Sequence, residues 1–372
     1  MRSRRWQVLL RGALITAAAV ALVACANNPP QTPSDQPGRA QDYLAPVGRF
    51  AVELDNLWNL VLAIAVVIFV LVEVLLLFSI FRYRERDDDD RRLPKQVHGN
   101  PRLEALWTII PALLLAFVAF PTVQTLFRLA DEPPEALRIQ VTGHQWWWEF
   151  TYPDYPQLKT ANILHIPTDR TVLLELTSAD VIHSFWIPKL AGKQDTVPGR
   201  VNILKLETHE PGEYLGQCAE YCGLSHANMR LRVIASPPTE FESWARQQAT
   251  PRPVGEATDV AARGAQVFAD RQCTVCHTIR GYEGAAGTVG PDLTYFSDRG
   301  WFAGAIFENT DENLRRWLEN PPVMKPMEPP PPPGQQAAEG QTGVAGMPNL
   351  GLNDEEIDAL LAFLRTLRSP AQ

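Results

Sequence analysis

The sequence predicts a membrane-anchored multidomain protein, in which a two-helix transmembrane hairpin is followed by an all-β domain and then by an all-α domain. Two apolar stretches, Leu60–Phe81 and Leu106–Phe127, are each long enough to cross a bilayer. Apolar and polar residues then alternate in short segments from Leu137 onward, as they do in β-strands. After a Cys-x-x-Cys-His motif at residues 273–277, apolar residues recur at helical spacing near the C-terminus.

The composition agrees with several domains and excludes one class of partner. A chain of 372 residues has room for two or three domains, and its formal charge of -8, without a basic patch, argues against binding nucleic acid. The 32 prolines cluster after the N-terminus, near 237–253 and near 321–333. The predicted division is a signal peptide at 1–24, a flexible segment at 25–48, the hairpin at 49–130, the β domain at 131–248, a linker at 249–256 and the α domain at 257–372.

The first residues have the pattern of an export signal. Arginines at positions 2, 4, 5 and 11 precede a short apolar run, Gly12–Ala24, which ends in Leu-Val-Ala immediately before Cys25. This ending resembles the bacterial lipoprotein box, in which the cysteine receives a diacylglycerol and becomes the mature N-terminus. The alternative is an uncleaved third membrane anchor, although the run is short for a span of about 20 residues.

The loop between the two apolar stretches gives their direction. Arg82–Arg102 is rich in arginine and lysine, and the positive-inside rule counts these residues while largely ignoring acids. This loop is therefore predicted to be cytoplasmic, which places both later domains outside, on the periplasmic face of a bacterial inner membrane. Glu73 lies within the first span, and an ionisable group there either faces an integral partner or reaches water near an interface.

The third part of the chain reads as an antiparallel sandwich or barrel. Leu137–Val141, Thr171–Leu176, Val201–Leu206 and Leu231–Ile234 alternate with period two and are separated by Pro and Gly. Folds of this kind carry ligands on loops at one end of a rigid scaffold.

The segment from residue 218 to residue 229 supplies such ligands. It contains Cys218, Cys222, His226 and Met229, and His183 would close the site from a neighbouring loop. Thiolates and thioethers are soft ligands and imidazole suits copper, so the set favours copper over magnesium or calcium. A structural zinc site is the alternative, but the Cys-x3-Cys-x3-His spacing is unusual for zinc and Met229 would have no role there.

The last domain carries the attachment signature of a c-type haem. Cys273 and Cys276 would form thioethers to the haem vinyl groups, and His277 would be the proximal iron ligand. A redox disulfide is the alternative for a bare Cys-x-x-Cys, but the adjacent histidine favours haem. The second axial ligand is one of three methionines downstream, Met324, Met327 and Met347.

Two helices are expected around this motif. Asp259–Phe268 precedes it, and Asn353 with Glu356 forms a capping box at the start of a terminal helix. One face of that terminal helix is apolar: Ile357, Leu360, Leu361, Leu364 and Leu367. A copper site and a covalent haem on one membrane-anchored chain indicate electron transfer. The remaining cysteine is Cys25, so no structural disulfide is expected.

Several motifs together resemble cytochrome c oxidase subunit II over about residues 45–248. They are Gly-His-Gln-Trp-Trp-Trp at 143–148, His-Ser-Phe-Trp at 183–186, the cysteine segment just described, and Leu-Glu-Ala-Leu-Trp-Thr-Ile-Ile-Pro at 103–111. The resemblance implies a cupredoxin fold with a dinuclear CuA centre, bridged by Cys218 and Cys222. It assigns His183 and Met229 to one copper, and His226 with the backbone carbonyl of Glu220 to the other.

The same resemblance implies roles for three further groups. Trp146 matches an aromatic residue through which electrons enter at a docking surface, with a packed ring as the alternative. The Glu220 carboxylate matches a ligand of a Mg²⁺ ion shared with subunit I. Glu104 matches a carboxylate near the entrance of a proton channel in subunit I, with a helix-capping role as the alternative. His144 is expected to be structural, and His98, His165 and His209 are expected on the surface.

The C-terminal part resembles a class I cytochrome c, which implies further pairs. Met347, in the loop before the last helix, would be the axial ligand; the insertion at 328–346, which this family usually lacks, leaves Met324 and Met327 as rivals. Pro291 would hold the His277 ring through its carbonyl. Gly264 and Phe363 would form the contact where the first and last helices cross.

Together the resemblances imply a caa3-type oxidase subunit, an oxidoreductase and translocase component. Electrons would pass from a cytochrome c-type donor through haem c and CuA to haem a of subunit I, where O₂ reduction is coupled to proton pumping, with subunit III as a further partner. The alternatives are a CuA-containing nitric oxide reductase subunit and a stand-alone membrane-tethered redox carrier.

Overall fold

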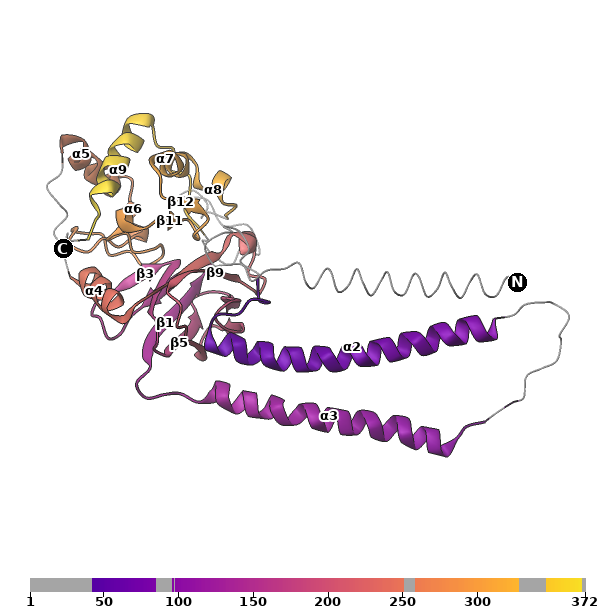
Figure 1. The fold of residues 1–372 in the computed structure, drawn as a ribbon. Helices are drawn as coiled ribbons and strands as arrows, with labels where there is room; N and C mark the ends of the chain where they lie inside the picture. The colour runs from indigo at the N-terminus through magenta and orange to yellow at the C-terminus, as the bar shows by residue number, and fades with distance from the viewer. Residues whose placement is uncertain (1–41, 85–95, 97, 251–257, 328–345, 370–372) are drawn as a thin grey trace.

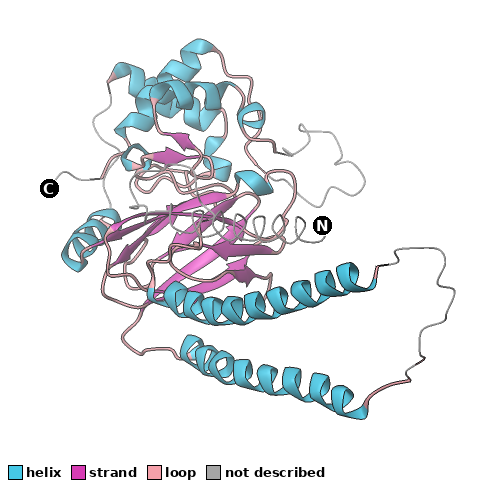
Figure 2. Ribbon diagram, turned by 45° about the vertical axis from the view of Figure 1, so that its right-hand side comes forward, coloured by secondary structure: helices cyan, strands magenta, loops and turns pink. Residues whose placement is uncertain are grey.

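The computed structural model describes residues 42–84, 96, 98–250, 258–327 and 346–369. Two long helices extend from a β-sandwich, and a C-terminal helical domain packs against the sandwich away from those helices (Figures 1 and 2). The predicted signal peptide with Cys25, most of the basic loop, most of the linker and nearly all of the insertion before Gly346 lie outside the described residues.

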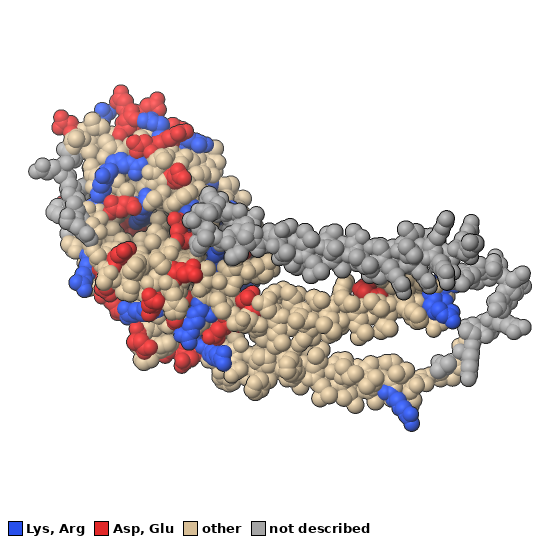
Figure 3. Space-filling model, in the orientation of Figure 1, with Lys and Arg blue, Asp and Glu red and all other residues tan. Residues whose placement is uncertain are grey.

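The two long helices contain the predicted spans. Helix α2 covers Arg49–Tyr83 and α3 covers Pro101–Ala130, and both are long and apolar enough to cross a membrane. Their side chains are almost all exposed in the isolated chain, which leaves an apolar, nearly uncharged surface (Figure 3). Asn100 caps α3 by accepting from the backbone N–H groups of Arg102 and Leu103. Glu104 is therefore not the cap, and it lies in the exposed first turn.

The hairpin is joined firmly to the β domain. Helix α2 has 35 residues and so measures about 52 Å, longer than the roughly 30 Å hydrocarbon core. Its first turn lies in the β-domain core, where Phe50 is buried beneath Lys205. The ammonium group of Lys205 also donates to the carbonyl oxygens of Arg128, at 2.8 Å, and Asp131, at 2.5 Å, at the end of α3.

The β domain consists of two five-stranded sheets with the orders β3-β2-β1-β5-β8 and β4-β10-β9-β6-β7. The strands are β1 Leu137–His144, β2 Trp147–Thr151, β3 Lys159–Ala161, β4 Ile163–Pro167, β5 Val172–Ser178, β6 His183–Trp186, β7 Gln194–Thr196, β8 Asn202–Leu206, β9 Gly212–Cys218 and β10 Arg230–Ser236. The expectation of a purely antiparallel arrangement was wrong, because β1 pairs with β5 and β10 pairs with β4 in parallel. In each parallel pair, the segment that connects the two strands contributes at least one strand to the opposite sheet.

Alternation explains the strands that the sequence predicted. In β1 every second side chain, beginning with Leu137, points into the core, and Ile139 and Val141 are fully buried there. Strands β2 and β4 lack this signal because consecutive residues are buried, as Trp147 and Trp148 show. These strands were therefore not predicted.

Helix α4, Pro238–Ala249, packs on the sandwich through Phe241 and Trp244. The Trp244 ring stacks on His165 at a centroid distance of 3.9 Å. His165 was expected on the surface, but it is partly buried by this helix, and burial lowers its pKa from 6.5 to about 3. His98 and His209 are exposed, as expected.

The C-terminal domain is mainly helical. Its helices are α5 Asp259–Asp270, α6 Cys273–Cys276, α7 Asp311–Glu319, α8 Pro321–Met324 and α9 Asp354–Thr366, and a short 3₁₀ turn covers Phe296–Asp298. A second 3₁₀ turn, His226–Asn228, belongs to the β domain. A two-stranded ribbon, β11 Trp301–Phe302 and β12 Phe307–Glu308, and an isolated bridge between Thr278 and Ala286 depart from the all-α expectation.

The predicted crossing of the first and last helices is present. A Cβ atom on Gly264 of α5 would lie 1.9 Å from the Ala359 carbonyl oxygen and 2.8 Å from the Phe363 Cβ of α9. Only glycine therefore allows the two backbones to approach this closely. The capping box of Asn353 and Glu356 is also formed, and the apolar face predicted for α9 is buried.

Candidate functional site

Six predicted donor groups meet at the end of the sandwich. The sulfur atoms of Cys218 and Cys222 lie 3.8 Å apart. The Cys218 sulfur is 4.0 Å from His183 Nδ1 and 3.2 Å from the Glu220 carbonyl oxygen. The Cys222 sulfur is 3.7 Å from the Nδ1 atom of His226 and 3.8 Å from the Met229 sulfur.

Two strands and a turn hold these donors. Cys218 ends β9, which pairs with β6, and β6 begins at His183. His183 was expected on a loop but stands at the start of this strand. The chain from Cys218 closes on itself, since the Cys218 N–H donates to the Met229 carbonyl and the His226 N–H donates to the Gly223 carbonyl.

The distances suit bound metal rather than a disulfide. A disulfide needs sulfur atoms about 2.05 Å apart, whereas two sulfurs bound at about 2.3 Å to one tetrahedral ion lie about 3.8 Å apart. Donor atoms of His183, Cys218 and Cys222 all lie within 4.8 Å of one another. Among the described residues, His226 does not join this group, so a single ion in that group would leave His226 out.

The two thiols differ in acidity. Hydrogen bonding from the Cys222 thiol, aided by His183, lowers the pKa of Cys218 to about 4, against the opposing effect of burial. The resulting thiolate, together with burial, raises the pKa of Cys222. Metal ions bind the deprotonated forms, so loading this site releases the Cys222 proton.

The haem-attachment residues lie on one turn of helix and on the extended residue that follows it. Cys273 and Cys276 are partly buried free thiols at the two ends of α6. The adjacent His277 donates from Nδ1 to the Pro291 carbonyl oxygen at 2.9 Å, which leaves Nε2 as the lone-pair nitrogen for iron. A Cβ on Gly290 would lie 2.7 Å from the His277 ring, so the loop closes tightly around the imidazole. These donors fit a covalently attached haem.

The rival methionines lie in different surroundings. Met347 packs against the core of the C-terminal domain, and its sulfur accepts from Trp317 Nε1 at 3.2 Å. Met327 instead packs against the core of the β domain. This difference favours Met347 as the iron ligand over Met327.

Three family models match successive parts of the chain. The cytochrome c oxidase subunit II transmembrane domain matches residues 47–125, its periplasmic domain matches 155–236, and cytochrome c matches 261–368. Cytochrome c oxidase subunit 2 of Alkalihalophilus pseudofirmus is 39% identical over 286 residues, which cover 75% of this chain and 77% of that protein. The Bacillus subtilis protein of the same name is 34% identical, over 76% of this chain and 79% of its own length.

The chain belongs to the cytochrome c oxidase subunit 2 family. The periplasmic domain of subunit II of cytochrome oxidase of Bradyrhizobium japonicum is a similar solved structure, 31% identical over 31% of this chain and 95% of that chain, with a TM-score of 0.30. The family models and the curated relatives confirm the predicted family and fold class. Membership identifies an oxidoreductase subunit of a haem–copper oxidase, a membrane protein with an outward β domain, and it implies CuA copper and haem c.

Residues of this subunit II chain that are not ligands hold the proposed ligands in place, and one of them, Asp180, belonged to no motif. Asp180 accepts from His183 Nε2 at 2.8 Å and so turns Nδ1 toward Cys218. The Cys222 carbonyl accepts from Gln145 Nε2 at 2.7 Å and from Trp146 Nε1 at 3.0 Å. An acid three residues before a metal-binding histidine was the available signal for Asp180, because ligand histidines usually donate to such a group.

The structure shows the surroundings of three further residues that the sequence singled out. The Trp146 ring is only 3% exposed, as in the alternative of a packed ring. The Glu220 side chain is exposed, while its carbonyl faces the copper ligands as expected. His144 stacks on Trp147 at 4.2 Å.

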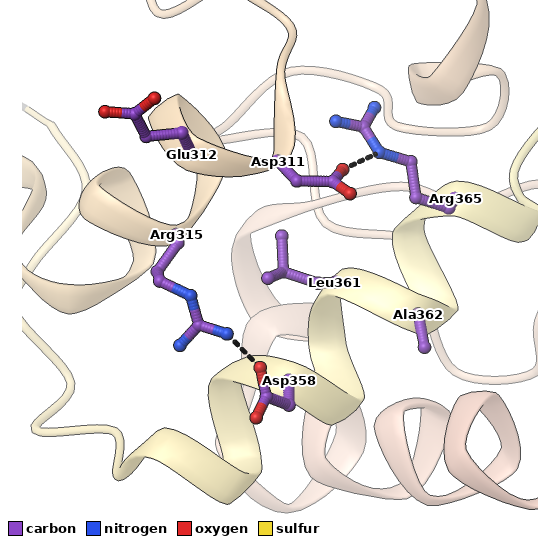
Figure 4. A pocket seen from close by; sticks show the side chains of 7 residues that line it. All are labelled: Asp311, Glu312, Arg315, Asp358, Leu361, Ala362 and Arg365. Carbon is purple, nitrogen blue, oxygen red and sulfur yellow. Dashed lines mark hydrogen bonds and ion pairs between the residues drawn. The ribbon is translucent and has the colours of Figure 1, made fainter.

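A surface pocket of this subunit II chain lies between α7 and α9 (Figure 4). Arg365 pairs with Asp311 at 2.7 Å, and Arg315 pairs with Asp358, so each pair bridges the two helices. These two pairs of charged residues in the pocket therefore join α7 to α9. None of the proposed metal or haem donors lines the pocket.

Proposed function

We propose that this chain takes electrons from a cytochrome c-type donor on haem c, passes them to a dinuclear CuA centre, and delivers them to haem a of subunit I. Oxygen reduction coupled to proton pumping would take place in that partner. The observation that carries the proposal is the convergence of six copper-type donors at one end of the β domain, on a chain that also bears a haem-attachment motif.

The proposed ligands divide between two coppers. Cys218 and Cys222 would supply thiolates to both ions, and His183 with Met229 would hold one of them. His226 and the Glu220 carbonyl would hold the other. When bound, the pair accepts and releases one electron. Burial of Cys218, Cys222 and Met229 keeps water from these donors, which favours a rigid site.

In the C-terminal domain, Cys273 and Cys276 would attach the haem. His277, oriented by the Pro291 carbonyl, and Met347 would ligate its iron. Methionine and histidine together favour a high potential, which suits a group that accepts electrons from a soluble donor. Trp146 would lie on the route toward copper, because its indole N–H donates to the carbonyl of Cys222.

The surface beside the copper ligands supports an integral partner. Tyr221 is 76% exposed and Leu224 is 54% exposed, and both flank the buried Cys222. Aromatic and aliphatic side chains in this position are typical of a protein contact. Subunit I would cover them, with the Glu220 carboxylate binding a shared Mg²⁺ ion and Glu104 standing near a proton-channel entrance. Subunit III would complete the complex in a bacterial inner membrane, with the signal peptide removed before a lipid-modified Cys25.

The test is to purify the complex and measure its metals, electron paramagnetic resonance (EPR) spectrum and reduced-minus-oxidised optical spectrum. Three coppers per complex are expected, two at CuA and one at the haem a3–CuB site of subunit I, together with one haem c, and O₂ turnover should exceed NO turnover. Faster NO reduction would instead indicate a nitric oxide reductase.

A matched variant tests the copper ligands directly. Cys222→Ser removes a bridging thiolate, so the dinuclear EPR and optical signals should disappear while the haem spectrum stays. An unchanged copper signal would refute the assignment. Arg230→Ala is the control, because Arg230 is exposed and directly follows the ligand Met229 without being a proposed ligand.

A further inference from the structure

A buried lysine joins the C-terminal domain to the β domain. Lys325 is 3% exposed, and its ammonium group donates to the Trp146 carbonyl oxygen at 2.6 Å and to the Ala303 carbonyl oxygen at 3.3 Å. One acceptor belongs to each domain. Burial lowers the pKa of Lys325 to about 7, and the amine keeps N–H donors in either protonation state.

The residues after Lys325 continue the contact. Ser225, buried between the proposed ligands Cys222 and His226, donates its hydroxyl to the Pro326 carbonyl. Met327 then packs against the β-domain core. Lys325–Met327, here called the strap, therefore lies directly on the segment that carries the copper ligands.

A glycine makes room for this contact. Gly304 has a φ of +86°, and a Cβ atom there would lie 2.5 Å from the Asn228 carbonyl oxygen of the β domain and 2.8 Å from the Lys325 Nζ atom. Asn228 immediately precedes the ligand Met229. A side chain at position 304 would push the two domains apart at the strap.

We infer that the strap is a positioning device that seats the haem-bearing domain against the copper-ligand segment and thereby sets the rate of electron transfer between haem c and CuA. The inference rests on the proposed function. Lys325 holds Trp146, and Trp146 in turn donates to the Cys222 carbonyl, so the strap connects to a copper ligand through two hydrogen bonds. In the transfer, the haem iron loses one electron and the copper pair gains it, with no bond made or broken.

The experiment follows that electron in the purified complex. A light-activated ruthenium donor reduces the haem in a flash, and absorbance then reports haem oxidation and CuA reduction. Lys325→Met removes the donor and keeps the length of the side chain, whereas Gly304→Ala keeps the amine and introduces the clash. Each should slow haem-to-copper transfer several-fold, because the rate of electron transfer falls steeply as the distance between the two centres grows.

Matched controls separate positioning from folding. Lys193→Met changes an exposed lysine, and Gly284→Ala imposes a similar positive φ, +81°, with no atom within 4 Å of the new Cβ. Both should keep the wild-type rate. The haem spectrum, the copper EPR signal and the rate of haem reduction by the flash should stay unchanged in Lys325→Met, which a general loss of structure would not allow.

The possible outcomes separate a failure of this inference from a failure of the proposed function. A wild-type transfer rate in Gly304→Ala would overturn the inference, and so would a wild-type rate in a Lys325→Met protein with normal spectra. If Lys325→Met lost a cofactor, Gly304→Ala alone would decide. A wild-type complex without copper, or without transfer between the centres, would instead refute the proposed function.

Discussion

Asp180 is the residue that most directly controls a copper ligand without being one. Its carboxylate accepts from His183 Nε2 and from the Gln145 backbone N–H. Burial would disfavour protonated His183, but the hydrogen bonds with Asp180 and Cys218 outweigh it and raise the pKa of His183. The same contact fixes the ring so that Nδ1 faces the cysteine sulfur.

Asp180→Asn should weaken copper binding about tenfold to a hundredfold, as changes in residues behind metal ligands commonly do. The neutral amide no longer favours the donated N–H of His183, so the ring is held less firmly. Copper content after dialysis against graded chelator measures the effect. Asp195→Asn is the control, because Asp195 is an exposed acid on β7, the strand paired with the His183 strand β6. Equal copper retention in the two variants would contradict the role of Asp180.

Met347→Ala should remove the absorption band of sulfur-to-iron ligation and lower the haem potential, because a thioether ligand stabilises ferrous haem. Optical spectra and a redox titration of the purified complex measure both effects. Met327→Ala is the comparison, since Met327 packs on the β domain. If Met327→Ala alone lost the band, the axial ligand would be Met327.

At the scale of single elements, helix α4 makes the stability of the β domain depend on pH. It stacks Trp244 on His165 and so holds the pKa of that imidazole at about 3, below its ordinary 6.5. Between these values the unfolded chain binds more protons than the folded one. As far as His165 decides it, the free energy of unfolding of the β domain is therefore greatest above pH 6.5 and decreases as the pH falls toward 3.

His165→Phe should make the loss of stability in acid shallower by at most about 1.4 kcal/mol per pH unit. The phenyl ring keeps the stack on Trp244 but binds no proton. The measurement is the apparent midpoint temperature for loss of the copper absorbance, taken from pH 7 to pH 4. The exposed His209, replaced in the same way, should leave the wild-type slope. A steeper slope in His165→Phe would reverse the argument.

Elements were predictable from the sequence where one pattern determines them. The terminal helix followed from Asn353, Glu356 and a single apolar face, and the crossing at Gly264 followed from the family resemblance. Strands such as β2 were missed because burial on both faces removes the alternation that distinguishes a strand.

The donor set of the site was predictable for a different reason. Copper chemistry limits ligands to few residue types, so Cys218 and Cys222 stand out in any fold. Lys325 gave no signal, and Asp180 gave only its position three residues before His183, because an aspartate or lysine acquires its role only when the tertiary structure brings it to His183 or Trp146.

For the whole molecule, the structure suggests that three parts act as one assembly. Lys325 joins the C-terminal domain to the β domain, and Lys205 joins the β domain to both membrane helices. Each lysine is buried and donates to backbone carbonyls rather than forming an exposed ion pair. Such contacts hold geometry at the cost of desolvating one charge, and they are less sensitive to salt than surface pairs.

Lys205→Met should therefore loosen the β domain from the hairpin. The variant leaves the carbonyls of Arg128 and Asp131 without their shared donor, which costs on the order of 1–3 kcal/mol. Partial digestion of the purified complex with a broad-specificity protease measures the change, and residues 131–136, between α3 and β1, should be cut several times faster. Lys159→Met is the control, because the Lys159 pair with Glu149 at the edge of the sheet contributes little. If the two variants were cut at the same rate, Lys205 would have no part in holding the copper domain at a fixed height above the membrane.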